Sequence, residues 1–229
     1  MSGAGDRRQR GKRTAARAAA AMVAPRSRVG LGTGSTVAEL LPALAERDLD
    51  LRCVATSPAT ADAARDLGLA VEPFTALDRL DVAIDGADQV APDGWLVKGG
   101  GGAHLRERIV AAAADRFLVI VDDGKLVERL HGPLPLELRP FGLAATLRRL
   151  PEAVVRDAPP SPDGGVIADL GPAAEIADPA ALAARLAATP GVADHGLFPP
   201  TLVAEVLVGA GDDLRRWTPS RGAQGPYRG

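Results

Sequence analysis

The stretch that decides the fold runs from Arg28 to Leu41 and reads RVGLGTGSTVAELL. Its order is a short strand, then a loop of Gly, Thr and Ser, then a helix. Such a loop presents unpaired backbone N–H groups at a helix N-terminus, where the partial positive charge binds phosphate or another anion. Ser35 and Thr36 can cap the helix, and their hydroxyls can also reach a ligand. We therefore favour an anion-binding loop, with a plain helix cap and tight-turn glycines as the alternative.

The loop differs from the two common nucleotide-binding loops. It is not a dinucleotide fingerprint, because the third glycine and the acidic ribose reader are not where that motif needs them. It is not a Walker loop either, because no Gly-Lys-Ser/Thr follows the glycines. The sequence therefore carries neither motif.

Strands and helices alternate on both sides of this loop. We expect helices over 12–24, 58–67 and 103–114, and strands over 51–56, 69–72, 80–84 and 117–121. Alternation at this spacing favours a mostly parallel sheet with helices on both faces. Ligands bind such sheets at the carboxyl ends of the strands. Residues 33–36, 56–57 and 85–88 are therefore expected to meet at one edge.

The stretch from Asp85 to Glu107 is where the sequence places the chemistry. Asp85 and Asp88 follow one apolar run, Lys98 ends a second, and four glycines follow the lysine. Consecutive glycines are costly to order, so a ligand that the backbone must approach closely explains them best. A carboxylate can remove a proton alpha to a carbonyl while a lysine or N–H donors hold the enediolate charge. The alternative is that the Asp pair caps a turn and Lys98 pairs with one of them.

Two further features bear on this site. The strand over 117–121 runs into Asp122-Asp123-Gly124-Lys125, so Lys125 is either an anion ligand or an exposed helix-start lysine. His104 stands alone at a helix start, and no Cys/His cluster has metal-ligand spacing, so a transition-metal site is not expected.

The second half of the chain has a different texture, with proline recurring from Pro133 onward. We expect strands over 134–138, 153–156, 166–170 and 203–208, and helices over 143–150 and 179–188. That order is typical of a split β-α-β-β-α-β unit. The predicted division is a disordered leader (1–11), a first domain (12–132 and 200–229) and a small α+β domain (133–199). Residues 211–229 are expected to be frayed.

Bulk composition excludes several classes of protein. The 229 residues are 46% hydrophobic and 24% charged, which is ordinary for a globular chain. The net charge of -2 gives no case for nucleic-acid binding by the whole chain. A single cysteine suits a reducing cytoplasm, and no apolar run approaches the roughly 20 residues of a membrane span. The basic run from Arg7 to Arg13 is read as a solvated tail in preference to an RNA-binding arm.

Taken together, the motifs resemble the type A ribose-5-phosphate isomerases. The matching motifs are GLGTGST (30–36), DVAIDGAD (81–88), KGGG (98–101), RE (106–107), PGV (190–192) and HGLF (195–198). They occur in the family's order and at its spacings, from about the first helix to the last strand. Each glycine loop alone is a weak signal, but the combination is highly specific.

The resemblance implies interconversion of D-ribose 5-phosphate and D-ribulose 5-phosphate through an enediolate, in the pentose phosphate pathway, with no cofactor or metal. It implies that Glu107 is the proton-shuttling base, that Asp85 and Lys98 handle the sugar's oxygens, and that Asp88 helps to open the ring. The positions that match substrate contacts of the family are Thr33, Gly34, Ser35, Thr36, Asp85, Gly86, Ala87, Asp88, Lys98, Gly99, Gly100, Gly101 and Lys125.

The implied fold is a Rossmann-like, mostly parallel α/β domain with helices on both faces, plus a small ferredoxin-like α+β domain. The implied assembly is a cytoplasmic homodimer or homotetramer. Its partner is a small phosphorylated sugar, with no role for nucleic acid or a membrane.

The chain departs from the family pattern at a few positions. Gln89 stands where Glu is usual, Gly102 where alanine is common, and Leu105 where a threonine often stands. None of these removes a proposed catalytic group, but together they leave substrate preference and rate open and allow a divergent paralogue. The main alternative is a non-catalytic sugar-phosphate sensor on the same scaffold, which would not need the carboxylate base. A sugar-phosphate deaminase or a CoA transferase is a second alternative, although a deaminase is expected to place a histidine near its base.

Overall fold

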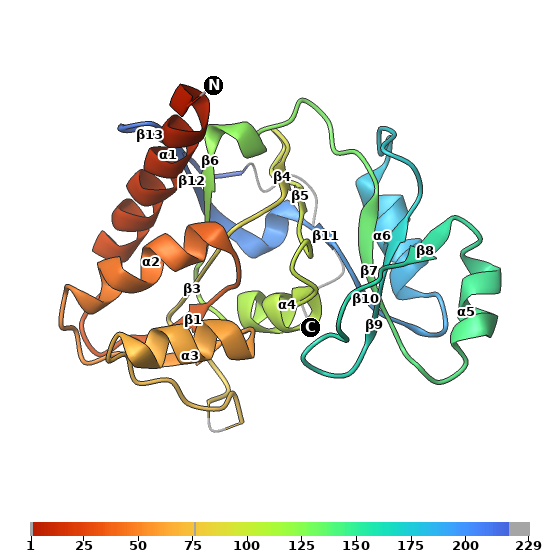
Figure 1. Cartoon of the computed structure of the whole chain (residues 1–229), viewed down its shortest axis with the longest axis horizontal. Coiled ribbons are helices and arrows are strands. Elements are labelled where there is room, and N and C mark those ends of the chain that lie inside the picture. The colour runs from red at the N-terminus through yellow and green to blue at the C-terminus, as the bar shows by residue number, and fades with distance from the viewer. Residues whose placement is uncertain (1, 76, 220–229) are drawn as a thin grey trace.

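The computed structural model describes residues 2–75 and 77–219. In this part of the chain the elements form two units that lie side by side, one around a six-stranded sheet and one around a four-stranded sheet (Figure 1). The helices α1 to α3 lie at one end of the molecule, and α5 and α6 lie at the other.

The larger sheet is mostly parallel. Its strands are β1 (Arg28–Leu31), β2 (Arg52–Ala55), β3 (Val82–Asp85), β6 (Phe117–Asp122), β12 (Val203–Ala210) and β13 (Asp213–Trp217). They are ordered β13-β12-β6-β3-β1-β2, and β13 is antiparallel to β12 while the other neighbours are parallel. Parallel strands need crossover helices, which the alternating sequence supplies.

Helices cover both faces of this sheet. They are α1 (Ser2–Ala21), α2 (Ser35–Ala45), α3 (Pro58–Asp66) and α4 (His104–Ala112). Leu118 and Ile120 of β6 pack into a core with α1, α2 and α3, whereas Val119 and Val121 pack into a core with α4. This alternation follows from the two-residue period of a strand and explains why β6 is apolar along its length. The predicted α/β layering is confirmed.

The leader is helical, so the prediction of a disordered segment is wrong for residues 2–11. The helix predicted over 12–24 is the second part of a longer one that docks on the sheet. Gly11 of α1 meets Gly209 of β12 so closely that a Cβ on Gly11 would lie 2.5 Å from the Gly209 carbonyl oxygen. Helices in proteins gain most of their stability from tertiary packing, which the polar composition of this segment conceals.

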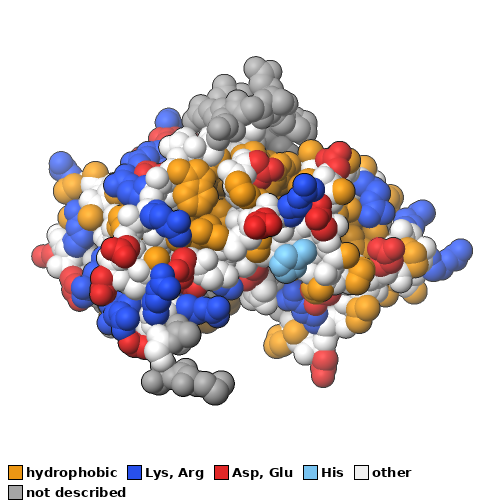
Figure 2. Space-filling model, turned by 90° about the horizontal axis from the view of Figure 1, so that it is seen from above, with side chains coloured by type: hydrophobic (Ala, Val, Ile, Leu, Met, Phe, Trp, Pro, Cys, Tyr) orange, Lys and Arg blue, Asp and Glu red, His pale blue; other side chains and the backbone are white. Residues whose placement is uncertain are grey.

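Basic side chains of α1 are paired with carboxylates. Arg10 pairs with Asp6 one helical turn away, and Arg13 Nε lies 3.1 Å from Glu39 Oε2. Acidic and basic side chains are interspersed on the face shown in Figure 2. These arginines therefore belong to an ion-paired helix surface and not to a solvated tail.

A small three-stranded sheet lies between the two units. It consists of β4 (Gln89–Val90), β5 (Leu96–Val97) and β11 (Leu197–Phe198), with β5 in the middle. The backbone N–H of Lys98 continues this pairing by donating to the Gly196 carbonyl at 2.9 Å. The backbone at Lys98, where the glycine loop begins, therefore follows a strand that is paired on both sides, with β4 and with β11.

The smaller unit follows the predicted β-α-β-β-α-β order. Its elements are β7 (Leu134–Leu138), α5 (Leu143–Arg149), β8 (Ala153–Val155), β9 (Val166–Leu170), α6 (Pro179–Ala187) and β10 (Val192–His195). The strands form an antiparallel sheet in the order β10-β7-β9-β8.

The last strand of this unit is not where the sequence analysis placed it. Residues 203–208 belong to β12 in the larger sheet, and the unit closes with β10. The charged Asp194 hides this strand in the sequence, because a buried carboxylate breaks an apolar pattern. Arg108 compensates the charge, with its Nε 2.7 Å from Asp194 Oδ1.

Three smaller differences complete the comparison. Residues 213–217, predicted to be frayed, form β13, while 220–229 lie outside the described residues. The strand predicted over 69–72 is reduced to one isolated bridge, between Cys53 and Val71. Short 3-10 turns, η1 (Asp123–Lys125) and η2 (Pro200–Leu202), follow β6 and precede β12. Among the described residues no helix is both long and apolar enough to cross a membrane.

Candidate active site

The carboxyl edge of the larger sheet meets the glycine loop in a cavity of about 100 Å³. It is lined by Thr33, Gly34, Ser35, Thr36, Gly86, Ala87, Asp88, Lys98, Gly99, Gly100, Gly101, Glu107 and Lys125. The structure thus brings the predicted site residues together, with Asp85 buried directly behind the lining. The meeting of 33–36 with 85–88 follows from the parallel order of β1 and β3.

A buried triad of charges forms the base of the site. Lys98 Nζ lies 2.8 Å from Asp85 Oδ2 and 3.3 Å from Glu107 Oε2, and it also donates to the Gly86 carbonyl at 2.5 Å. Each of the three side chains is less than 6% exposed. The contact with Glu107 is an ion pair without hydrogen-bond geometry, so Glu107 Oε2 has no hydrogen-bond partner within the described residues.

Asp85 is fixed in place by the backbone around it. Its Oδ1 accepts from the N–H of Thr33 at 3.1 Å and from the N–H of Gly86 at 2.7 Å. A Cβ at Gly32 would lie 1.9 Å from the Asp85 carboxylate, so only glycine fits there. Lys98 does pair with one of the two aspartates, as the structural alternative proposed, but this pairing also aims Lys98 at Glu107.

Burial sets the proton affinities of this triad. Burial raises the pKa of Glu107 to about 8, and the negative charge of Asp85 adds to the effect while Lys98 opposes it. Burial also raises the pKa of Asp85, again opposed by Lys98. For Lys98, burial lowers the pKa, but the attraction of Asp85 and Glu107 outweighs it and the pKa is raised. A lysine that stays charged thus faces a carboxyl that titrates near neutral pH.

The aromatic ring of Phe198 lies between two cations. Lys98 Nζ is 5.6 Å from the ring centroid, and the Arg108 guanidinium carbon is 4.1 Å from it. Contacts of this kind are attractive because the ring face is electron-rich. Phe198, which is fully buried, therefore gives Lys98 an apolar neighbour with an electron-rich face.

Asp88 occupies a different position from Asp85. It does not pair with Lys98, and its Oδ2 accepts from the backbone N–H of Gly100 at 2.8 Å. Its side chain is partly exposed and lines the cavity. One aspartate thus holds the lysine, and the other holds the glycine loop while still facing the cavity.

The opposite end of the cavity is an N-terminus of a helix. Gly34 is the N-cap of α2, with φ 127°, and no side chain caps the helix, so the expected capping by Ser35 or Thr36 is wrong. Both hydroxyl residues line the cavity together with Lys125. Behind them the Thr33 hydroxyl lies 2.8 Å from that of Thr56. Free N–H groups, hydroxyls and a lysine at a helix start make an anion site.

Lys12 lies beside the site, where the sequence analysis did not predict it. Its Nζ donates to Ser35 Oγ at 2.9 Å, so helix α1 brings a second cation to the start of α2. The available signal is helical spacing, because Lys12 shares a face with the buried Ala15, Ala16 and Ala19. A lysine on the buried face of a helix needs an explanation that a lysine on a solvated tail does not.

Comparison with known proteins decides the family. Residues 52–213 match the family model of ribose 5-phosphate isomerase A, phosphoriboisomerase A. The ribose-5-phosphate isomerase A of Caulobacter sp. strain K31 is 42% identical over 222 residues, which cover 91% of this chain and 97% of the relative. This chain belongs to the ribose 5-phosphate isomerase A family.

Solved structures agree with that assignment. Ribose 5-phosphate isomerase A from Neisseria gonorrhoeae superposes with a TM-score of 0.86 at 30% identity and covers 92% of this chain and 96% of its own. A D-ribose-5-phosphate isomerase in complex with phospho-erythronic acid has a TM-score of 0.83 at 31% identity, with coverage of 90% and 97%. The likeness extends over both units of the fold.

The departures from the isomerase A pattern lie around the cavity and not in it. Gln89 faces away, donating from Nε2 to the His131 carbonyl at 2.8 Å. Gly102 adopts a left-handed backbone, with φ 71°, at the end of the loop. His104 is fully buried behind Gly99, and burial together with Arg108 lowers its pKa to about 3, so it is neutral at physiological pH.

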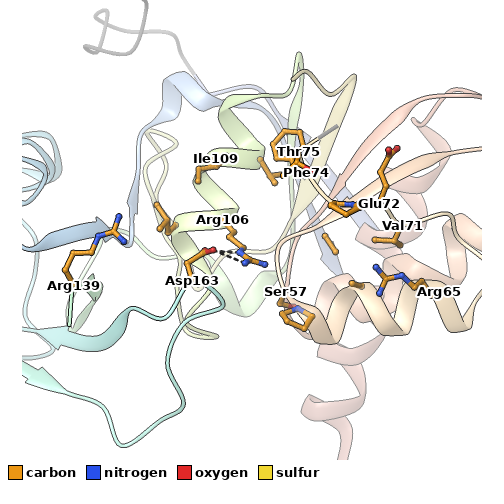
Figure 3. A pocket seen from close by; sticks show the side chains of 16 residues that line it. Ser57, Arg65, Val71, Glu72, Phe74, Thr75, Arg106, Ile109, Arg139 and Asp163 are labelled. Atoms are coloured by element: carbon orange, nitrogen blue, oxygen red, sulfur yellow. Dashed lines mark hydrogen bonds and ion pairs between the residues drawn. The ribbon is translucent and has the colours of Figure 1, made fainter. Parts of the chain in front are cut away.

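A larger hollow of about 660 Å³ lies on the other side of α4 (Figure 3). Leu105 and Ile109 line it, so the third departure also lies outside the catalytic cavity. Arg106 of α4 reaches across it to Asp163 of the smaller unit, with two contacts of 2.8 Å. This ion pair is one of the links between the two units.

Proposed function

We propose that this chain interconverts D-ribose 5-phosphate and D-ribulose 5-phosphate through an enediolate, with Glu107 as the base. The observation that carries the proposal is the buried Glu107 carboxyl, which lines the cavity 3.3 Å from Lys98 and has a pKa of about 8. A general base is most effective when its pKa lies near the working pH. Family membership supplies the substrate.

The proton moves within a small set of groups. Glu107 takes the proton from C2 of the open aldose, and electrons from that C–H bond form the C1–C2 double bond of the enediolate. Lys98, held by Asp85, stabilises the charge on the sugar oxygens. The hydroxyl proton passes from O2 to O1, and Glu107 returns its proton to C1. C1 is reduced and C2 is oxidised, so the reaction needs no external oxidant or reductant.

Asp88 serves the step before proton transfer. Ribose 5-phosphate in solution is mainly a ring, which must open to expose the C1 carbonyl. Asp88 lines the cavity with a partly exposed carboxylate, and it can accept the C1 hydroxyl proton and pass it to the ring oxygen as the bond between C1 and that oxygen breaks. The hydrogen bond that Asp88 accepts from the Gly100 N–H holds the carboxylate toward the loop.

The phosphate of the substrate is proposed to lie at the start of α2. That helix end has two hydroxyls around it, from Ser35 and Thr36, and two cations, Lys12 and Lys125. A related isomerase has been solved in complex with phospho-erythronic acid. That ligand is a phosphorylated four-carbon acid, and its planar carboxylate has the charge and shape of an enediolate.

We also propose the assembly and the domain division that the family resemblance implies. The chain works in the cytoplasm as a homodimer or homotetramer. Its smaller domain is residues 133–199, and the larger one combines 12–132 with 200–229, to which the helical leader is added. Light scattering during size-exclusion chromatography measures the assembly directly.

The decisive experiment is isomerisation of ribose 5-phosphate by the purified chain in excess chelator, beside Glu107→Gln. Removing one general base is expected to lower kcat by about a hundredfold to ten-thousandfold. Glu46→Gln, at an exposed position at the end of α2, is the matched control and keeps full activity. A parent that binds the sugar phosphate but does not isomerise it would mean a sensor and not an enzyme.

A further inference from the structure

Arg156 reaches from the smaller unit to the glycine loop of the site. It follows β8 directly and forks onto Asp169 of β9, with Nε and Nη2 each 2.7 Å from a carboxylate oxygen. Its remaining nitrogen, Nη1, donates to the Gly99 carbonyl at 3.2 Å and to the Gly100 carbonyl at 3.1 Å. A single guanidinium therefore joins a strand of the four-stranded sheet to the loop that lines the cavity.

This contact fixes the orientation of two peptide planes. A trans peptide is planar, so its C=O and N–H point in opposite directions. The Gly99–Gly100 peptide is held at both ends, by Arg156 at the carbonyl and by Asp88 at the N–H. In the next peptide, Arg156 holds the Gly100 carbonyl, which turns the Gly101 N–H to the other side.

The freed N–H group lies where a substrate can use it. Gly101 lines the cavity, and its N–H has no acceptor in the part of the chain that the structure describes. Glycines lack a side chain that would hold these planes, and they lose the most freedom on ordering. The loop has one turn bond of its own, from the Gly102 N–H to the Gly99 carbonyl at 3.1 Å, and Arg156 adds a donor to that carbonyl and one to the Gly100 carbonyl.

We propose that Arg156, oriented by Asp169, is a positioning residue for the isomerisation, acting through the peptide planes of Gly99 to Gly101. The inference rests on the proposed function and adds to it that the smaller unit takes part in catalysis. Arg156 does not touch the substrate. It sets the direction of the backbone donor that faces the developing enediolate charge, and such preorganised donors are effective because they need not reorient during the reaction.

If Arg156 had only a structural role, its removal would lower stability and not turnover. Arg106 and Asp163 already connect α4 to the smaller unit, so Arg156 is not needed as the link between units (Figure 3). The Arg156 and Asp169 side chains are 22% and 29% exposed, and ion pairs of that exposure contribute little to stability. The expected loss is therefore in turnover and not in folding.

The test is Arg156→Ala with added guanidinium ion. Misplacing a catalytic element by about 1 Å can lower the rate about a hundredfold, so kcat is expected to fall by that order while KM changes much less. Millimolar guanidinium chloride, far below unfolding concentrations, should restore part of kcat in a saturable way, whereas sodium chloride at equal ionic strength should not. Arg156→Lys should not restore it, because an ammonium cannot fork onto a carboxylate and also reach two carbonyls.

The matched control is Arg28→Ala. Arg28 forks onto Asp81 in the same way, with contacts of 2.7 and 3.2 Å and exposures of 31% and 40%, but it lies at the opposite edge of the sheet. This variant should keep its kcat and show no response to guanidinium. A second readout is amide hydrogen exchange at Gly100, whose N–H donates to Asp88, and it should accelerate in Arg156→Ala and stay unchanged in the control.

The outcomes separate the two proposals. A parent without isomerase activity overturns the proposed function, while the amide exchange still tests the clamp. An active parent whose Arg156→Ala variant keeps kcat within about threefold overturns the positioning role. The same holds if guanidinium restores nothing and the melting temperature falls well below that of the control variant.

Discussion

The pH dependence of turnover provides a sharp test of the buried triad. With a Glu107 pKa of about 8, the ionised fraction is about 1% at pH 6, about 9% at pH 7 and one half at pH 8. Only the ionised carboxylate accepts the C2 proton, so kcat/KM should rise about tenfold per pH unit below pH 8 and level off above it. The profile of kcat/KM reports the free enzyme, which is the state that the structure describes.

The direction of the effect can be checked with one substitution. Asp85 raises the pKa of Glu107 by charge repulsion, so Asp85→Asn should move the midpoint of the acid limb to lower pH. The maximal rate should fall as well, because Lys98 loses its 2.8 Å partner. Height and midpoint are separate parameters of the profile, so the shift can be measured even in a slow variant.

The assay is the initial rate of ketose formation from ribose 5-phosphate at low substrate concentration, from pH 6 to pH 9. The second ionisation of a phosphate ester lies near pH 6, well apart from the expected midpoint. A profile that is already level at pH 6 would refute the assignment of Glu107 as a buried base with a raised pKa. So would a midpoint that moves upward in Asp85→Asn.

Three further predictions follow from the geometry. Glu107→Gln should raise the free energy of unfolding at pH 9 by on the order of a few kcal/mol, and the melting temperature with it, because a folded-state pKa of about 8 against an ordinary 4.5 destabilises the fold progressively as pH rises between those values. A less stable variant would contradict the burial argument. Lys12→Ala should raise KM for ribose 5-phosphate about tenfold or more with a smaller change in kcat, as expected for the loss of a charge-assisted phosphate contact. The control is Arg13→Ala, which should leave steady-state kinetics unchanged because Arg13 pairs with Glu39. Gly209→Ala should destabilise the chain by about 1–3 kcal/mol in denaturant unfolding, because its Cβ would fall 1.8 Å from a carbonyl oxygen of α1; equal stability would mean that α1 does not dock as described.

Local sequence patterns predicted the larger unit well because each of its strands and helices can be recognised from its own stretch of sequence. The strands of the parallel sheet are short and largely apolar, and β3 and β6 each end in an aspartate. Once such strands are parallel, their carboxyl ends must meet, so the convergence of Asp85 with Thr33 follows from topology. Lys98 and Glu107 join them because a short strand and a helix start flank the same glycine loop.

The groups that the sequence did not predict act over long distances in the chain. Lys12 reaches Ser35 from another helix, and Arg156 reaches Gly99 from another sheet. Neither side chain belongs to a motif. Helical spacing with buried alanines is the only signal for Lys12, and nothing local distinguishes Arg156 from an exposed cation. The helix cap was misjudged for a different reason, since a shift by one residue places Gly34 at the N-cap and leaves the hydroxyls for a ligand.

The contact between α1 and β12 has a consequence for how the chain is made. The first helix packs against α2 and β6 as well as against β12, a strand that begins at Val203, so its packing is complete only when nearly the whole chain has been synthesised. The four-stranded sheet draws its elements from one continuous segment, Leu134 to His195, and can form while the ribosome is still adding β12. Until then the side of α1 that packs against β12 stays uncovered. Assembly is therefore expected to end with β12, which completes the packing of the N-terminal helix and brings the two ends of the chain together.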